Sequence, residues 1–296
     1  MTARLLPGDE LARGIREEAS RDASVLTSKL GRAPVLVAIE AAREGATRVF
    51  GKAKRAAARE IGIRARHVRV DPASGEAGFA AALRAASADP AIDAITIERP
   101  LPASWDVVGL QELIAPEKDI EGLHPVNMGR LVSGAPVRFV PPAAEAALVL
   151  LRASGLALEG AQVAVVGAGF GVGRPVALLL LDAKATVEVC HIATRDLASR
   201  TRTADALVVC AGSPGLIRAS MIKPGAVVID VGTTVVHDPT TGERCTRGDV
   251  HEDVASVATA VTPVPGGVGP LTVALLLRNA LRAASRLHEL SEKAHG

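Results

Sequence analysis

The chain has 296 residues, of which 48% are hydrophobic and 22% are charged, so it can bury a sizeable core, and its length favours two domains. Basic and acidic residues number 34 and 32, and aromatic residues make up only 2%, which argues against a nucleic-acid surface and against base-stacking platforms. Three widely spaced cysteines fit neither a disulfide framework nor a zinc site, and no uninterrupted apolar stretch is typical of a signal or membrane segment. We therefore expect a cytoplasmic, globular protein with no nucleic-acid partner and no membrane partner.

The N-terminal part alternates between helical and strand patterns. Residues 10–30 carry apolar side chains at helical spacing among charges, which predicts an amphipathic helix. Two short apolar runs, at 34–41 and 91–98, predict buried strands. The other elements expected here are helices at 46–61 and 78–88 and a strand that begins at 68–70. This alternation predicts a parallel sheet with helices on its faces.

A Gly- and Pro-rich segment at 116–136 follows without sustained periodicity, and we interpret it as a linker or a functional loop. The alternation then resumes with a helix at 143–155 and a strand–turn–helix–strand unit at 162–191. The remaining expected elements are strands at 206–212, 226–232 and 260–264 and a final helix from 271 to about 293.

The sequence GAGFGVG, at 167–173, follows an apolar strand and opens a helix. Glycines at this place let the backbone approach a pyrophosphate, and the helix N-terminus supplies N–H donors and positive potential. The spacing is GxGxxxG rather than GxGxxG, and a lone glycine turn can merely connect a strand to a helix. Because the flanking strands and the helix are also present, we predict a dinucleotide site.

The choice between NADP and NAD depends on the end of the next strand. Glu188 has roughly the spacing of the acid that binds a ribose in NAD enzymes, but it lies inside the strand pattern rather than at its end. At the strand end, no acid would repel a 2′-phosphate, and Arg195 or Arg174 can reach one. We therefore favour NADP, with NAD as the alternative.

Polar residues gather at strand ends and in the loop of the N-terminal part. Lys54 lies in a basic, Ala-rich helix, Glu98 ends a buried strand, and Asp119, Glu121 and His124 lie in the loop. Strand ends and loops are where open α/β sheets place ligand-contacting residues, although each residue can also serve as a cap or a solvent-exposed charge. The histidines lack the spacing of metal ligands, so we expect no metal site.

Several segments together resemble the methylenetetrahydrofolate dehydrogenase/cyclohydrolase family. KDIEGLHPVNMGRL (118–131) resembles its central loop, and TPVPGGVGPLT (262–272) is similar to its C-terminal signature. GAGFGVGRP (167–175) resembles its cofactor turn, and ITIERPLP (95–102) resembles its VQLPLP strand end. The resemblance covers essentially the whole chain in collinear order.

The resemblance implies two α/β domains flanking a cleft, with a catalytic folate domain at 1–142 that the helix 271–296 joins, and a Rossmann-type NAD(P) domain at 143–270. It implies oxidation of 5,10-methylenetetrahydrofolate by hydride transfer to NADP or NAD, followed by hydrolysis to 10-formyltetrahydrofolate, in a homodimer. The folate-site residues implied are Phe50, Lys54, Ile97, Glu98, Arg99, Glu121, Pro265, Gly266, Gly267, Val268 and Gly269, with Lys54, Glu98, Phe50 and Glu121 in the chemistry. The cofactor residues implied are Gly167, Ala168, Gly169, Gly171, Gly173, His191, Thr194, Arg195 and Thr233.

The departures from the family pattern lie mainly at the folate residues. The family's tyrosine is Phe50 here, its glutamine is Glu98, and its pterin-binding aspartate is Glu121. A lysine that activates water must spend time neutral, whereas Glu98 beside Lys54 would hold it charged. We therefore expect dehydrogenase activity with doubtful cyclohydrolase activity. A fully bifunctional enzyme, a dehydrogenase of a non-folate substrate, and a non-catalytic folate- or nucleotide-binding paralogue remain as alternatives.

Overall fold

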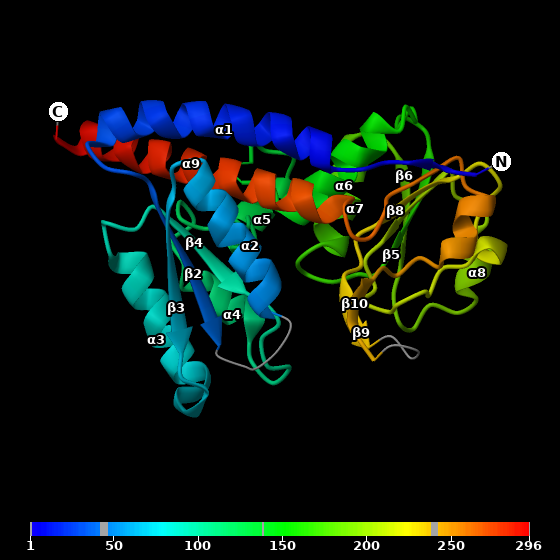
Figure 1. Cartoon of the computed structure of the whole chain (residues 1–296), viewed down its shortest axis with the longest axis horizontal. Helices are drawn as coiled ribbons and strands as arrows, with labels where there is room; N and C mark the ends of the chain where they lie inside the picture. Colours follow the sequence, from blue (N-terminus) through cyan, green and yellow to red (C-terminus); the bar gives the residue numbers. More distant parts are fainter. Residues whose placement is uncertain (1, 42–46, 138, 238–241, 296) are drawn as a thin grey trace. The chain divides into compact units, whose positions relative to one another are not determined.

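The computed structural model describes residues 2–41, 47–137, 139–237 and 242–295, and its chain divides into two compact units (Figure 1). The three-stranded unit comprises Arg13–Val140 and Val273–Gly296, and the six-stranded unit comprises Met1–Ala12 and Pro141–Thr272. The sequence analysis placed the first 12 residues with the N-terminal domain instead. They join the six-stranded unit because β1 (Arg4–Leu5) pairs in parallel with β11 (Ala260–Val261).

The three-stranded unit is a parallel sheet between two layers of helices. Its strand order is β3-β2-β4, with β2 at Val35–Ala41, β3 at Arg64–Val70 and β4 at Ala94–Glu98. Helices α1 (Asp9–Leu30), α2 (Thr47–Glu60) and α9 (Val268–His295) pack apolar side chains on one face, and α1 and α9 run side by side (Figure 1). Helices α3 (Gly75–Ala88) and α4 (Val107–Glu112) cover the other face.

The alternation of strands explains where the polar residues of this unit lie. Every residue of β2 and β4 is buried, as the apolar runs predict for strands covered on both faces. The residues of β3 alternate between exposed and half-buried over most of its length, and all seven pair with β2, so this edge strand begins four residues earlier than expected. Glu40 and Glu98 are register partners at the carboxyl ends of β2 and β4, which places both carboxylates on one face.

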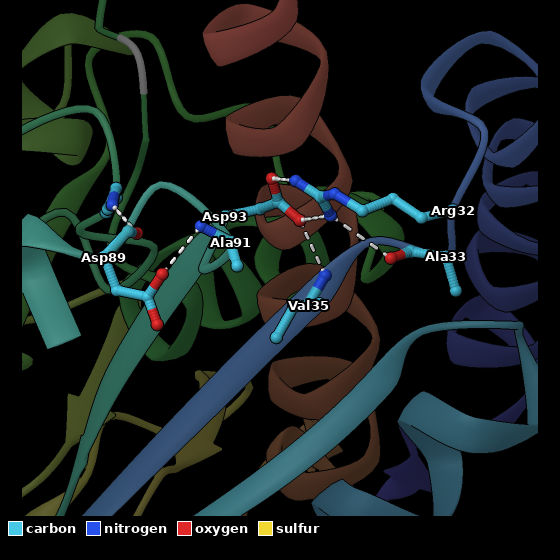
Figure 2. A network of polar contacts seen from close by, with 7 residues as sticks. Arg32, Ala33, Val35, Asp89, Ala91 and Asp93 are labelled. Atoms are coloured by element: carbon cyan, nitrogen blue, oxygen red, sulfur yellow. Dashed lines mark hydrogen bonds and ion pairs between the residues drawn. The ribbon is translucent and has the colours of Figure 1, made fainter.

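The amino-terminal edge of the same sheet is fixed by an ion pair (Figure 2). Arg32 donates from Nη1 to Asp93 Oδ2 at 2.7 Å and from Nη2 to Asp93 Oδ1 at 2.8 Å. Asp93 Oδ2 also accepts from the backbone N–H of Val35 at 2.7 Å. A two-pronged guanidinium–carboxylate pair of this kind is geometrically specific, so it fixes where β2 and β4 start relative to each other.

The six-stranded unit has strand order β1-β11-β8-β7-β5-β6, and all neighbours are parallel. Its further strands are β5 (Gln162–Val166), β6 (Thr186–Cys190), β7 (Ala206–Val209) and β8 (Val227–Asp230). Its helices are α6 (Pro142–Ala153), α7 (Gly173–Asp182) and α8 (Leu197–Thr201). Strands β6 and β7 flank β5 on opposite sides, so the order of the chain reverses beside β5, and ligands of such sheets bind outside the strand ends at this point.

Two segments differ from the sequence prediction. The loop expected at 116–136 contains α5 (Pro125–Val132), which begins because His124 Nδ1 accepts from the Val126 N–H at 3.0 Å and Pro125 occupies the first turn. An antiparallel pair, β9 (Thr234–His237) and β10 (Arg244–Arg247), was not expected. Within the described residues, no helix is both long enough and apolar enough to cross a membrane.

Candidate functional site

A buried ion pair lies at the carboxyl end of β4. Lys54 Nζ, from α2, is 2.8 Å from Glu98 Oε2, and the two side chains are 9% and 4% exposed. The second carboxylate oxygen, Glu98 Oε1, is buried and has no hydrogen-bond partner among the described residues. A β-carbon added to Gly51, one helical turn before Lys54, would lie 3.4 Å from this oxygen, so glycine at this position leaves space beside it.

A second acid–base pair continues the row along β4. The hydroxyl of Thr96, two residues before Glu98 on the same face, donates to Glu121 Oε1. Arg99 Nε lies 3.9 Å from Glu121 Oε2. The sequence analysis did not single out Thr96, although its position two residues before Glu98 in a strand pattern is a usable signal. Two carboxylates and two cations thus gather at one strand end.

The neighbouring strands extend the charged row. Glu40 Oε2 lies 2.8 Å from His67 Nε2 and 3.5 Å from Arg69 Nε. Burial, followed by the charge of Arg55, lowers the pKa of His67 against the opposing effect of Glu40. Each carboxylate on this face therefore has its own basic partner. The sequence analysis did not single out Glu40 as a residue of this site.

Two expected folate residues need separate comment. The side chain of Ile97 lies in the hydrophobic core on the opposite face of β4, because alternate strand residues point to opposite sides. The side chain therefore does not line the site with Glu98, and the folate contact that we predicted for Ile97 stays a prediction about its backbone. Phe50 belongs to α2, but its side chain lies outside the described part of the chain, so its role stays a prediction.

Asp119, which we considered for the rim of the site, instead accepts hydrogen bonds that hold its own loop in place. Its Oδ2 accepts from the His124 N–H at 2.7 Å and from Asn127 Nδ2 at 2.9 Å, and its Oδ1 accepts from Gln111 Nε2 at 2.9 Å. Burial raises the pKa of Asp119 to about 6, against the bonds from His124 and Asn127, which lower it. Asp119 and His124 are therefore structural groups that hold the segment carrying Glu121.

Replacing Asp119 by Asn should flatten the pH dependence of stability. Because the pKa of about 6 lies above the ordinary 3.8, the contribution of Asp119 is fully present below the lower value and is lost as pH rises through the higher one. The asparagine keeps the shape and does not titrate, and Gln111 can turn its unpartnered Oε1 towards the new amide. The free energy of unfolding, measured with urea, should fall less from about pH 4 to about pH 7 in the variant than in the wild type. The two falls should differ by about 1.4 kcal/mol per pKa unit removed. An equal loss in both proteins would contradict this assignment.

The glycine turn joins β5 to α7 at the point where the strand order reverses. Gly167 has φ +114°, and an added β-carbon would lie 2.4 Å from the carbonyl oxygen of Cys210, at the end of β7. One added to Gly173 would lie 1.8 Å from the carbonyl oxygen of Gly167. These two glycines are therefore required by the fold itself.

Gly169 and Gly171 differ, because added β-carbons there would meet no atom within 4 Å among the described residues. They leave space above the first turn of α7, and the N-cap residue Val172 makes no side-chain capping bond, so no side chain competes from that position for the helix amides. Such amides bind phosphate oxygens, so the turn fits the pyrophosphate of a dinucleotide.

The other expected cofactor residues follow neighbouring strands at the same edge. Beyond β6, Thr194 Oγ1 accepts from the His191 N–H at 2.8 Å, and Arg195 is exposed. Glu188 lies within β6 and pairs with Arg200 at 3.4 Å, so it does not occupy the strand end. Thr233 is exposed just beyond β8. Ala168 accepts from Arg174 Nε at 3.2 Å.

Two aspartates that we did not expect hold these loops together. Asp230, at the end of β8, accepts from the backbone N–H groups of Gly232, Asp249 and Val250 at 2.9 to 3.0 Å. Asp249 Oδ2 accepts from the Ala211 and Gly212 amides at 2.7 and 2.8 Å. Burial raises the pKa of Asp230 to about 6. A single sequence does not distinguish such supporting carboxylates from surface charges.

The expected folate residues 265–269 lie in the six-stranded unit, between β11 and the start of α9. Gly266 has φ +104°, its carbonyl oxygen accepts from the Gly8 N–H at 2.8 Å, and Val268 begins the helix. An added β-carbon on Gly267 would lie 2.6 Å from the Pro263 carbonyl oxygen. Lys54 and Glu98 lie in the other unit. In the part of the chain that the structure describes, no cluster of three or more His, Cys, Asp or Glu side chains is arranged to hold a metal ion.

Two family models together match most of the chain. Residues 6–121 match the tetrahydrofolate dehydrogenase/cyclohydrolase catalytic domain, and residues 141–288 match the NAD(P)-binding domain of the same family. The bifunctional protein FolD of Bordetella avium is 44% identical over 97% of this chain and 99% of its own length. That of Chloroflexus aurantiacus is 39% identical over 96% and 98%.

Solved structures agree with the sequence matches. The Trypanosoma brucei N5,N10-methylenetetrahydrofolate dehydrogenase-cyclohydrolase, complexed with NADP and an inhibitor, has a TM-score of 0.90 and 38% identity over 97% of this chain and 98% of its own. The Campylobacter jejuni enzyme has a TM-score of 0.88 and 36% identity over 96% and 99%. The chain therefore belongs to the tetrahydrofolate dehydrogenase/cyclohydrolase family.

Proposed function

We propose that this protein oxidises 5,10-methylenetetrahydrofolate to the 5,10-methenyl form and reduces NADP. The observation that carries the proposal is the pairing of Lys54 with Glu98 at 2.8 Å at the end of β4, in a chain that also keeps an open glycine turn. The methylene carbon between N5 and N10 loses a hydride, which the nicotinamide ring accepts when NADP is bound. The folate product becomes a cation.

The charges of the site suit this first step. Because Lys54 and Glu98 form a neutral pair, positive charge on the folate meets no net repulsion from them. Glu98 Oε1, which has no hydrogen-bond partner among the described residues, can still accept a hydrogen bond. Water addition to the methenyl group makes a different demand, because the attacking water must give up a proton to a base. An ammonium group that is ion-paired with Glu98, as Lys54 is, has no lone pair with which to accept it. We therefore propose a dehydrogenase with weak cyclohydrolase activity.

A fully bifunctional enzyme is the second candidate, and one observation favours it. Glu98 Oε1 has no hydrogen-bond partner among the described residues, so the carboxylate itself can take the proton of water. In this case Lys54 acts only as its electrostatic partner. The two candidates differ in which side chain is the base, and variants of Glu98 separate them.

The cofactor and the setting are part of the proposal. We propose NADP rather than NAD, since Glu188 lies away from the strand end and Arg195 is exposed just beyond it. Glu121 is proposed to bind the pterin ring, because a carboxylate accepts from two adjacent N–H groups. We further propose a cytoplasmic homodimer, which light scattering in solution can measure, and no nucleic-acid or membrane partner.

A direct assay tests the proposal. The purified chain is mixed with 5,10-methylenetetrahydrofolate and NADP or NAD, and the reduced nicotinamide is followed by its absorbance. We expect faster turnover with NADP, and we expect Arg195→Ser to raise the KM for NADP by roughly tenfold or more through loss of a charged phosphate contact, with little effect on NAD. No turnover with either cofactor would refute the proposed function. An unchanged KM in the variant would refute only the role of Arg195.

A further inference from the structure

Arg99 is placed beside the carboxylate that we assign to the pterin ring. It follows β4 directly, and its Nε lies 3.9 Å from Glu121 Oε2. The Arg99 side chain is 34% exposed, so a ligand can reach part of it, whereas Glu121 is 16% exposed. An arginine at this position is not required by the strand, which ends at Glu98.

The guanidinium has donors that the described residues leave unused. Nε and Nη2 of Arg99 are buried and have no hydrogen-bond acceptor there, and 3.9 Å is too long for a hydrogen bond to Glu121. Buried donors without acceptors are unfavourable, and native structures contain few of them. Because the guanidinium group is planar and turns as one unit, a rotation of the side chain would present these donors to an incoming acceptor.

Glu121 is held in place for the same ligand. The hydroxyl of Thr96, which is 1% exposed, donates to Glu121 Oε1 from the face of β4. Each carboxylate oxygen can accept more than one hydrogen bond, so both oxygens can still accept from a ligand. The carboxylate and the guanidinium together present acceptors next to donors.

We propose that Arg99 and Glu121 jointly recognise the amino–oxo edge of the pterin ring, which makes Arg99 a specificity-determining residue. This edge carries the 2-amino group, N3–H and the 4-oxo oxygen in a row, that is, two donors followed by one acceptor. Glu121 accepts from the two donors, and Arg99 donates to the 4-oxo oxygen. The inference rests on the proposed function, because it takes a folate as the substrate.

The proposal predicts a preference for a 4-oxo group to which Arg99 contributes separately from Glu121. A 4-amino-4-deoxy pterin also lacks the hydrogen on N3, so Glu121 discriminates against it as well. Arginine has only donors, so a 4-amino group in place of the 4-oxo group would face a guanidinium that cannot accept from it. A site built to bond a polar group of its substrate discriminates strongly against an analogue without it. The chain should therefore prefer 4-oxo pterins over 4-amino pterins.

The test uses two ligands that differ in the 4-substituent and in the hydrogen on N3, tetrahydrofolate and its 4-amino-4-deoxy analogue, with calorimetry on the full chain. We expect the wild type to bind the 4-oxo ligand roughly tenfold or more tightly. Arg99→Met should weaken binding of the 4-oxo ligand and reduce the preference to the part that Glu121 provides, and Arg99→Lys should retain more of it. Arg66→Met, at an exposed position of β3, serves as the matched control and should change neither affinity.

Two outcomes would overturn the inference. A preference in Arg99→Met equal to that of the wild type would show that Arg99 does not contact the 4-oxo group. An equal loss of affinity for both ligands would show that Arg99 merely supports Glu121. Dehydrogenase turnover of the wild type is measured in parallel. Its absence would refute the proposed function, whereas normal turnover with either of the two outcomes would refute the role of Arg99 alone.

Discussion

Gly169→Asp is expected to abolish NADP binding while leaving the chain folded. An added β-carbon at Gly169 meets no atom within 4 Å among the described residues, so the protein itself does not oppose a side chain there. The aspartate would instead occupy the space above the first turn of α7 and place a negative charge where the pyrophosphate binds. Steric exclusion and charge repulsion act together, so the affinity should fall by roughly a hundredfold or more.

The measurement is calorimetric titration of NADP, with thermal unfolding as the test of folding. Gly14→Asp is the matched control, because Gly14 is exposed on α1 and an added β-carbon also meets nothing within 4 Å. This control should bind NADP as the wild type does. Retained affinity in Gly169→Asp would remove the glycine turn from the cofactor site. Gly167 and Gly173 are unsuitable for this test, because substitution at either would disturb the backbone around it.

Glu98→Gln should raise the rate of methenyltetrahydrofolate hydrolysis by roughly tenfold or more, if Glu98 suppresses this reaction by keeping Lys54 charged. The glutamine keeps an oxygen that can accept from Lys54, which lies 2.8 Å from Glu98 Oε2, but removes the negative charge that favours the ammonium form. A positioned general base contributes about 100- to 10,000-fold to a proton transfer, so a gain of about tenfold requires only partial recovery of this role by Lys54. Hydrolysis is followed as a function of pH, after subtraction of the spontaneous rate.

The opposite result has an equally definite meaning. If Glu98 is itself the base that accepts the proton of water, Glu98→Gln slows hydrolysis, and the proposed role of Lys54 is then wrong. Glu40→Gln is the matched control, because Glu40 is the register partner of Glu98 but pairs with His67 and Arg69. It removes the same charge from the same face without touching Lys54, so it should change hydrolysis much less.

The parts of the fold that follow from local pattern could be predicted from the sequence. The apolar runs that became β2 and β4 are buried strands because helices cover both faces of the three-stranded sheet. The runs that became β5 and β7 are likewise buried, apart from Gln162 at the start of β5. The glycine turn was predicted for the same reason that the structure shows, since strand, turn and helix follow one another directly.

The remaining features depend on contacts between distant residues. Helix α5 is too short to show a clear periodicity, and its start depends on the His124 cap. Strand β1 has only two residues, and their pairing depends on β11. Within the site, the sequence predicted that Lys54 and Glu98 lie together. It could not predict that Thr96 would fix Glu121 or that Arg99 would keep unused donors, because these depend on side-chain geometry.

The path of the chain has a consequence for its synthesis. The chain leaves the six-stranded unit after Ala12, returns at Pro141 and leaves again after Thr272. Strand β1 cannot pair until β11, near the other end of the chain, has been synthesised. The apolar face of the three-stranded sheet likewise stays uncovered until α9 has been synthesised. The six-stranded unit can therefore complete its sheet only after β11 has been synthesised, and the three-stranded unit can complete its core only after α9 has been synthesised. A chain that ends before α9 leaves that apolar face uncovered, so we expect truncated chains to aggregate.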